Sequence, residues 1–139
     1  MKTYHHGNLK KELIKIACKL CERDGYTKLS IRSLAKESKV SQTAPYRHFK
    51  TKEDLYAAIT KEGFDKLNKE MLSIKAKNPK NYLIDCGKSY IDFGLKNANT
   101  YDLMFGTAVG NYADYPELSE SANNLFQILL SNFKKLSSD

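Results

Sequence analysis

The chain carries a short run of side chains suited to recognising nucleic acid, QTAPYRHF, at residues 42–49. The amide of Gln42 can form two hydrogen bonds with one adenine, and the methyl groups of Thr43 and Ala44 can contact thymine. Hydroxyl and cationic groups bind phosphate oxygens, and such contacts position a protein on DNA without specifying the sequence. The side chains suited to phosphate are Lys10, Ser30, Arg32, Tyr46, His48 and Lys52.

The aromatic residues of this run also have a purely structural interpretation, in which they pack in the core. For Phe49 we favour that interpretation, because nothing in an apolar ring recognises phosphate. For Tyr46 we expect both roles, with the ring packed and the hydroxyl directed outward.

The positive charge of the chain is concentrated in its first third. The whole chain has a formal net charge of +7, but residues 1–52 hold 13 Lys and Arg against 4 Asp and Glu, a net +9. The remaining residues hold 10 against 12, a net −2. This asymmetry favours a basic surface for a polyanion at one end of the molecule, although lysines that merely solvate the surface remain an alternative.

Apolar periodicity predicts an all-α fold, because no segment alternates apolar and polar residues as a strand would. An amphipathic helix should begin at Asn8 and end before Gly25. Ser30 should cap a second helix and Ser41 a third that reaches Phe49.

A long fourth helix should begin at Thr51 and continue on one apolar face until NPK interrupts it near Asn78, so that it joins the basic end rigidly to the rest. The helix after Pro79 is apolar over most of its circumference, which predicts a central place in a bundle. A short helix at 100–105 and a last amphipathic helix from 117 to 136 complete the prediction.

Pro45 limits where the third helix can begin. A proline in a helix interior costs roughly 3 kcal/mol, whereas the first turn tolerates it. With Ser41 as N-cap, Pro45 lies at the edge of that first turn. Two short helices joined by a tight turn and packed on a basic first helix form a helix-turn-helix, whose second helix enters the major groove of DNA.

The run YHHGNLKKELIKIACKLCERDGYTKLSIRSLAKESKVSQTAPYRHFKTKEDLYAAI resembles the DNA-binding domain of TetR-type transcriptional regulators, over roughly residues 4–64. Within that family, YHHGNL, APYRHF and YIDFGLKNANTYDLMFG are similar to the branch whose C-terminal part carries a WHG domain. The resemblance implies a helix-turn-helix domain at residues 1–50 and a helical effector and dimerisation domain at residues 51–139.

The resemblance further implies a cytoplasmic homodimer that binds a palindromic operator in double-stranded DNA. It would act as a repressor that a small hydrophobic effector releases. Apolar walls with a few phenol hydroxyls could form the effector pocket, although for any single residue we favour plain core packing. The pocket residues so implied are Phe64, Leu67, Met71, Tyr90, Phe93, Tyr101, Met104 and Phe105.

Two departures from the family pattern stand out. Lys39 occupies a turn position where the family usually has glycine, and a left-handed conformation there would cost about 1 kcal/mol. The chain also ends after the seventh predicted helix, without the WHG motif and without two further helices of the family's dimer interface. Ile128 and Leu130 then point away from the main apolar face and need a cover. A truncated regulator acting as a protein-interaction module, without operator binding of its own, is the alternative.

Other reactive residues do not form a convincing site. Cys18 and Cys21 lie on or beside the apolar face of the first helix, without a second pair that would hold a metal. His5 and His6 could meet a phosphate or a metal but are more simply solvated, and His48 has no nucleophile in a plausible constellation. We therefore predict no enzyme activity, no cofactor and no metal. No apolar run approaches the ~18 residues of a membrane span.

Overall fold

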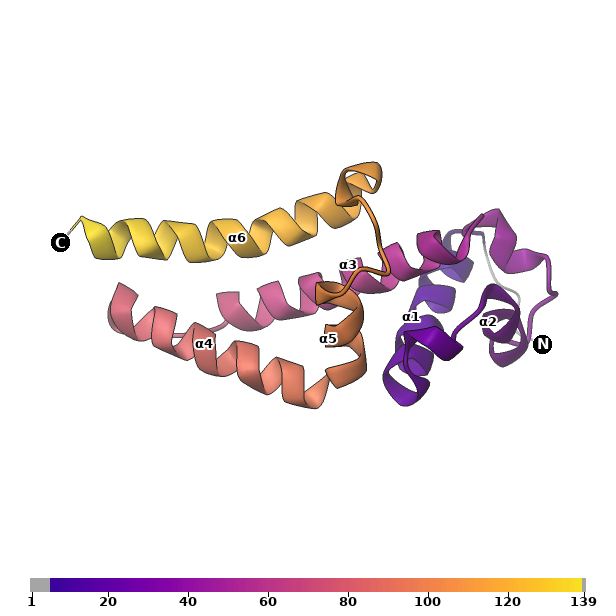
Figure 1. Cartoon of the computed structure of the whole chain (residues 1–139), viewed down its shortest axis with the longest axis horizontal. Coiled ribbons are helices and arrows are strands. Elements are labelled where there is room, and N and C mark those ends of the chain that lie inside the picture. Colours follow the sequence, from indigo (N-terminus) through magenta and orange to yellow (C-terminus); the bar gives the residue numbers. More distant parts are fainter. Residues whose placement is uncertain (1–5, 139) are drawn as a thin grey trace.

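The computed structural model describes residues 6–138, and the side chains from Asn8 onward. It consists of helices joined by short loops, without a strand among the described residues, so the predicted all-α class is confirmed. Figure 1 shows α1 and α2 gathered at one end of an elongated molecule, while α4 and α6 flank α3 at the other end. The elements are α1 (His6–Asp24), η1 (Tyr26–Lys28), α2 (Ile31–Glu37), η2 (Ala44–Arg47), α3 (Lys52–Leu72), α4 (Pro79–Lys96), α5 (Ala98–Phe105), η3 (Tyr112–Asp114) and α6 (Pro116–Ser137).

Side-chain caps explain where α2 and α3 begin. The Ser30 hydroxyl accepts a hydrogen bond from the Ser33 amide at 2.9 Å, and the Ser33 hydroxyl accepts one from the Ser30 amide. Thr51 and Asp54 form the same reciprocal capping box at the start of α3. Both predicted caps are therefore confirmed. Asn8, by contrast, lies inside α1, which begins at His6.

Helix ends follow the predicted pattern less closely. Gly25 ends α1 as predicted, with a left-handed φ of 85° that glycine adopts without strain. The long helix α3 ends at Leu72, with Ser73 as its C-cap, well before the predicted break near Asn78. Asn78 instead caps α4, where its side chain accepts a hydrogen bond from the Asn81 amide at 2.9 Å.

The core is one cluster that runs through both ends of the molecule. Leu13 and Ala17 of α1, Leu34 of α2 and Leu118 of α6 are buried in it. The long helix α3 supplies buried residues along its whole length and packs against α1, α4, α5 and α6. One continuous helix, α3, joins the basic end to the rest, as predicted.

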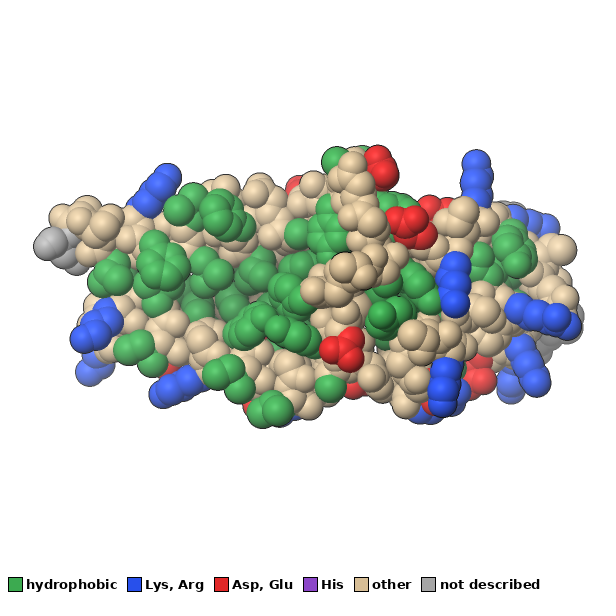
Figure 2. Space-filling model, in the orientation of Figure 1, with side chains coloured by type: hydrophobic (Ala, Val, Ile, Leu, Met, Phe, Trp, Pro, Cys, Tyr) green, Lys and Arg blue, Asp and Glu red, His purple; other side chains and the backbone are tan. Residues whose placement is uncertain are grey.

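The predicted central place of α4 is wrong. Only Cys86 and Phe93 of α4 are buried, whereas Ile84, Ile91 and Leu95 are 47%, 63% and 78% exposed. The helix α4 is apolar over most of its circumference, as predicted. However, only one face of α4 packs on α3, α5 and α6, and the other face is uncovered. Figure 2 shows a broad apolar area between α4 and α6.

The last helix, α6, distributes its apolar residues differently from the prediction. Phe133 and Leu136, expected on the buried face, are 55% and 41% exposed, and Phe126 is 57% exposed. Ile128, expected to point away, packs against the core, and Leu130 is half-buried. The reason is that α3 ends at Leu72, so the far end of α6 has less of α3 to cover it. In the described residues, no helix is both long and apolar enough to cross a bilayer.

Candidate nucleic-acid interface

The turn between α2 and η2 is closed by backbone hydrogen bonds from the end of α2. The Ser38 amide donates to the Leu34 carbonyl at 2.9 Å, and the Val40 amide reaches back to the Ala35 carbonyl at 3.2 Å. Between them Lys39 has a φ of 57° and is the one non-glycine residue with positive φ among those described. The predicted left-handed conformation at Lys39 is thus present. The turn reverses the chain within a few residues and places η2 against α2.

The third helical element is a single 3₁₀ turn, not the predicted helix from Ser41 to Phe49. Its hydrogen bonds run from the Tyr46 amide to the Thr43 carbonyl at 3.2 Å and from the His48 amide to the Pro45 carbonyl at 3.0 Å. Pro45 lies in the first turn, as predicted. Amides of a first turn have few partners within the helix, so the missing amide hydrogen of proline costs little there.

Ser41 does not cap this element. Its hydroxyl lies 3.3 Å from the hydroxyl of Thr43, and Thr43 precedes η2 without a side-chain cap. In a regular α-helix starting at Ser41, the amide of residue 45 would donate to the Ser41 carbonyl. Pro45 has no amide hydrogen, so that bond is missing, and the segment forms a tighter 3₁₀ turn instead of an α-helix.

Most of the predicted DNA contacts lie on the surface of this end of the molecule. Gln42, Thr43 and Tyr46 are exposed beside η2, Tyr46 by 50%, so its ring is only partly packed. Arg32 on α2 is exposed too. Figure 2 shows Lys and Arg side chains projecting from this end of the molecule. Lys10 on α1 and Lys52 at the start of α3 are likewise exposed.

One of the predicted contacts is buried, and another has a structural role. Ala44 is only 8% exposed, so its methyl group packs inside and the expected contact with thymine is wrong. Ser30 is half-buried and caps α2. Phe49 is 2% exposed, which confirms its core role.

The lysine at the start of α3 contacts a neighbouring aromatic ring. The Lys52 ammonium lies 5.5 Å from the centroid of the Tyr56 ring, a cation–π contact, and the Tyr56 hydroxyl donates to the Tyr26 carbonyl at 2.8 Å. Half-buried His48 and exposed Lys10 line a cavity of about 480 Å³, together with Asp114 and other residues of the loop before α6.

Residues 13–59, which include the whole helix-turn-helix, match the family model described as "Bacterial regulatory proteins, tetR family". They form a TetR-family N-terminal domain. Over 67 residues, 48% of this chain, the sequence is 37% identical to the "Uncharacterized HTH-type transcriptional regulator YuxN" of Bacillus subtilis (strain 168). That match covers 23% of the relative, so the chain spans less than a quarter of this curated relative.

Solved structures agree with the fold over nearly the whole chain. A "protein with unknown function from Rhodococcus sp. RHA1" superposes with a TM-score of 0.82 and 25% identity, covering 99% of this chain and 72% of that one. A "tetR-family transcriptional regulator from Streptomyces coelicolor" superposes with a TM-score of 0.73 and 20% identity, covering 94% of this chain and 60% of that one. The helices that follow the TetR-family domain therefore adopt the same arrangement as in these structures. The WHG-type branch stays a prediction.

Contacts between this domain and the later helices were not predicted from the sequence. The Glu22 carboxylate at the end of α1 accepts hydrogen bonds from the amide and the hydroxyl of Thr100, at 3.1 and 2.9 Å. The Asn99 side chain donates to the Glu22 carbonyl at 2.7 Å. At the start of α3, Glu53 accepts a hydrogen bond from the Gly110 amide at 2.9 Å. The partners in these hydrogen bonds are far apart in the sequence, so no local pattern predicts that they meet.

The residues expected to form the effector pocket are mostly packed together. Five of them are buried in the core, namely Phe64, Leu67, Met71, Phe93 and Met104. The other three form an aromatic cluster with Phe64, in which the hydroxyls of Tyr90 and Tyr101 lie 2.6 Å apart and Phe105 is 43% exposed. Burial, aided by this hydrogen bond, raises the pKa of Tyr90 to about 12.

A cavity of about 720 Å³ lies elsewhere, between α1 and the helices α3, α4 and α5, and Phe93 is the one predicted pocket residue that lines it. Core packing thus accounts for the buried members of the predicted pocket, and an effector pocket built from them stays a prediction. Cys18 lies at the floor of this cavity, where burial raises the pKa of its thiol to about 12. Cys21 is fully buried, in agreement with the structural reading of the CxxC pair, and His5 and His6 have no described side chains.

Proposed function

We propose that the protein is a DNA-binding transcriptional regulator of the TetR type that acts as a repressor. The observation that carries the proposal is the exposure of Gln42, Thr43 and Tyr46 on a rigid segment immediately after α2, at the end where the cationic residues gather. A rigid surface segment flanked by cations suits the major groove, because side chains there must reach base edges while the charges meet phosphates.

In this proposal the exposed residues divide into two groups. Gln42 and Thr43 contact base edges and determine which sequence is preferred. The phosphate contacts position the domain and supply most of the salt-dependent affinity. They are Lys10, Ser30, Arg32, Tyr46, His48 and Lys52. Ala44 is left out because it is buried.

We further infer that two copies bind a palindromic operator in the cytoplasm. A homodimer would place two such domains on successive half-sites. The uncovered apolar faces of α4 and α6 support the need for a partner, since apolar areas of this extent rarely stay exposed on a monomer.

Release by a small-molecule effector requires that the later helices control the position of the DNA-binding domain. We take residues 1–50 as the DNA-binding unit and residues 51–139 as the unit that senses the effector and dimerises. The hydrogen bonds from Thr100 to Glu22 are direct ties between the two units. An effector that displaces α5 would therefore pull on α1.

The test is the salt dependence of binding to the palindrome upstream of the protein's own gene, measured by fluorescence anisotropy. Each phosphate contact contributes about 0.9 to the log-log slope of affinity against salt. Lys52→Ala should reduce the slope by roughly that amount and weaken binding to all sequences alike. Gln42→Ala should instead change the preferred base at one position in each half-site.

Lys88→Ala is the matched control, because Lys88 is an exposed lysine on α4, outside the DNA-binding domain, and should leave both properties unchanged. If Lys52→Ala and Gln42→Ala both bind as the wild type does, the interface is placed wrongly. If the wild-type chain binds no DNA at low salt but associates with other regulators through α4 and α6, the protein-interaction alternative holds.

A further inference from the structure

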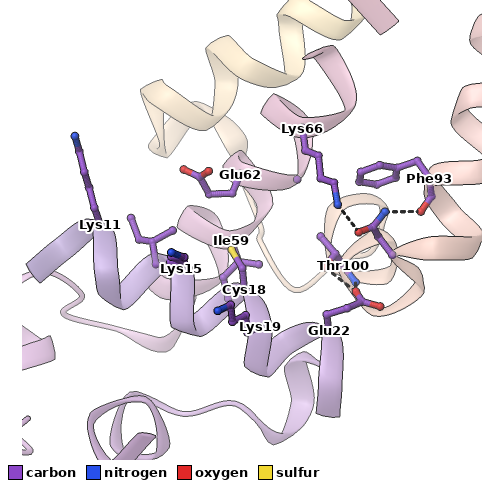
Figure 3. A pocket seen from close by; sticks show the side chains of 13 residues that line it. Lys11, Lys15, Cys18, Lys19, Glu22, Ile59, Glu62, Lys66, Phe93 and Thr100 are labelled. Carbon is purple, nitrogen blue, oxygen red and sulfur yellow. Dashed lines mark hydrogen bonds between the residues drawn. The ribbon is translucent and has the colours of Figure 1, made fainter. Parts of the chain in front are cut away.

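The 720 Å³ cavity is a groove between the DNA-binding domain and the later helices, and no residue of the aromatic cluster lines it. Figure 3 shows one wall formed by α1 and the opposite wall by α3 and the residues around the start of α5. Its volume lies within the range of roughly 300–1,000 Å³ that is typical of small-molecule sites.

The floor of the groove is apolar and firmly packed. Ile59 is 0% exposed and Phe93 is 1% exposed, so both belong to the core beneath the groove and offer almost no surface to a ligand. The accessible apolar surface comes from Ile14 and Cys18 of α1, which are half-buried. Because the pKa of Cys18 is about 12, its thiol stays neutral at physiological pH and behaves as a small apolar group.

The rim of the groove is cationic. Lys11, Lys15 and Lys19 follow one another at intervals of four residues, which places them on one face of α1. Lys66 lies across the groove on α3, and its ammonium donates a hydrogen bond to the Asn97 side-chain oxygen at 2.9 Å. Like charges four residues apart on a helix repel, and a bound anion would relieve that repulsion.

The carboxylates of the groove do not neutralise this rim. The two carboxylates that line the groove are those of Glu22, which accepts hydrogen bonds from Thr100, and of exposed Glu62. Within residues 6–138, none of the four lysines forms an ion pair, whereas neighbouring Lys61 pairs with Asp65 at 2.6 Å. Four cations against two anions leave a net charge of +2 around an apolar floor.

We propose that this groove binds an organic anion with an apolar chain, its anionic head among the lysines and its chain on Ile14 and Cys18. A carboxylate and a phosphate share this head-group chemistry. Such a ligand would contact α1 from one side and α3, α4 and α5 from the other. Binding itself is independent of the proposed function, and only its effect on DNA affinity rests on that proposal.

Binding is tested first without DNA, by isothermal titration calorimetry on the whole chain. The probes are decanoate, monodecyl phosphate, decanol and acetate. Saturable binding of decanoate or monodecyl phosphate at one site per chain is expected, and the tighter of the two identifies the head group. Decanol lacks the charge and acetate lacks the chain, so each should bind at least about tenfold more weakly. Equal binding of decanoate and decanol, or no saturable binding of either anion, would overturn the proposal.

Variants then locate the site. Lys15→Gln and Lys66→Gln, on opposite walls, should each weaken the favoured anion about fivefold. Lys69→Gln is the control, since Lys69 is an exposed lysine of α3 that does not line the groove. Circular dichroism confirms that each variant is folded. If both groove variants bind as tightly as Lys69→Gln does, the anion binds elsewhere and the proposed site is wrong.

A separate titration of the wild type with operator DNA, in the absence of any probe, keeps the two questions apart. If DNA binds and the anion does not, only the groove proposal fails. If the anion binds and DNA does not, the groove proposal stands while the proposed function fails.

Discussion

Replacing Lys39 by glycine should stabilise the protein. Lys39 closes α2 with a φ of 57°, held by the hydrogen bonds from its own amide to Lys36 and from the Val40 amide to Ala35. A left-handed conformation costs an L-residue roughly 1–2 kcal/mol, whereas glycine adopts it freely. Glycine loses roughly 0.5–1 kcal/mol more backbone entropy on folding. The difference favours Lys39→Gly by about 0.5–1 kcal/mol.

The measurement is urea unfolding followed by circular dichroism at 222 nm (the far-ultraviolet helix signal), with thermal unfolding as a second reading. For a chain of this size the gain corresponds to a rise in Tm of about 2–4 °C. Lys39→Ala should give no such gain, because the Cβ atom that causes the strain remains.

Lys36→Gly tests whether the effect belongs to the backbone conformation. Lys36 lies in the last turn of α2 with helical geometry, so glycine there should cost about 1 kcal/mol. The reasoning is refuted if Lys39→Gly is no more stable than Lys39→Ala, or if both glycine variants change stability in the same direction.

Three further predictions concern other parts of the molecule. Thr51→Ala should lower the free energy of unfolding by about 1 kcal/mol, and Thr51→Ser should retain it, because the hydroxyl caps α3; chemical unfolding measures both. The pKa of Tyr90 is about 12 in the folded protein and about 10 in the unfolded chain, so the unfolded chain loses the phenol proton first as the pH rises. The free energy of unfolding should therefore fall between pH 10 and 12, and the fall should be shallower in Tyr90→Phe. Phe133→Ser should weaken self-association in sedimentation, because Phe133 is 55% exposed, and equal association of variant and wild type would place the dimer contact elsewhere.

Local patterns were enough to predict the helices, several of their ends and the character of the DNA-binding segment. Ser30 and Thr51 were identified as caps because a capping box involves residues only three apart. The left-handed turn at Lys39 was identified from its place in the family pattern. Such features involve neighbours in the chain, so the sequence displays both partners at once.

Errors arose where packing selects among several local possibilities. The third element became a 3₁₀ turn, with Ala44 buried against its surroundings, although an α-helix starting at Ser41 fitted the composition. On α4 and α6 the apolar residues were recognised, but which of them are covered depends on where α3 ends. An amphipathic pattern states how much apolar surface a helix has, and the neighbouring helices decide which part of it is buried.

The sequence by itself determined the all-α class, the basic first third and the caps of α2 and α3, because each of these depends on composition or on residues a few positions apart. Only the tertiary structure decided how Lys66 of α3 comes to face Lys11, Lys15 and Lys19 of α1, and how Glu22 comes to bind Thr100. Those partners are tens of residues apart in the chain. Their meeting depends on how the helices pack around α3, and no local pattern of side chains records that.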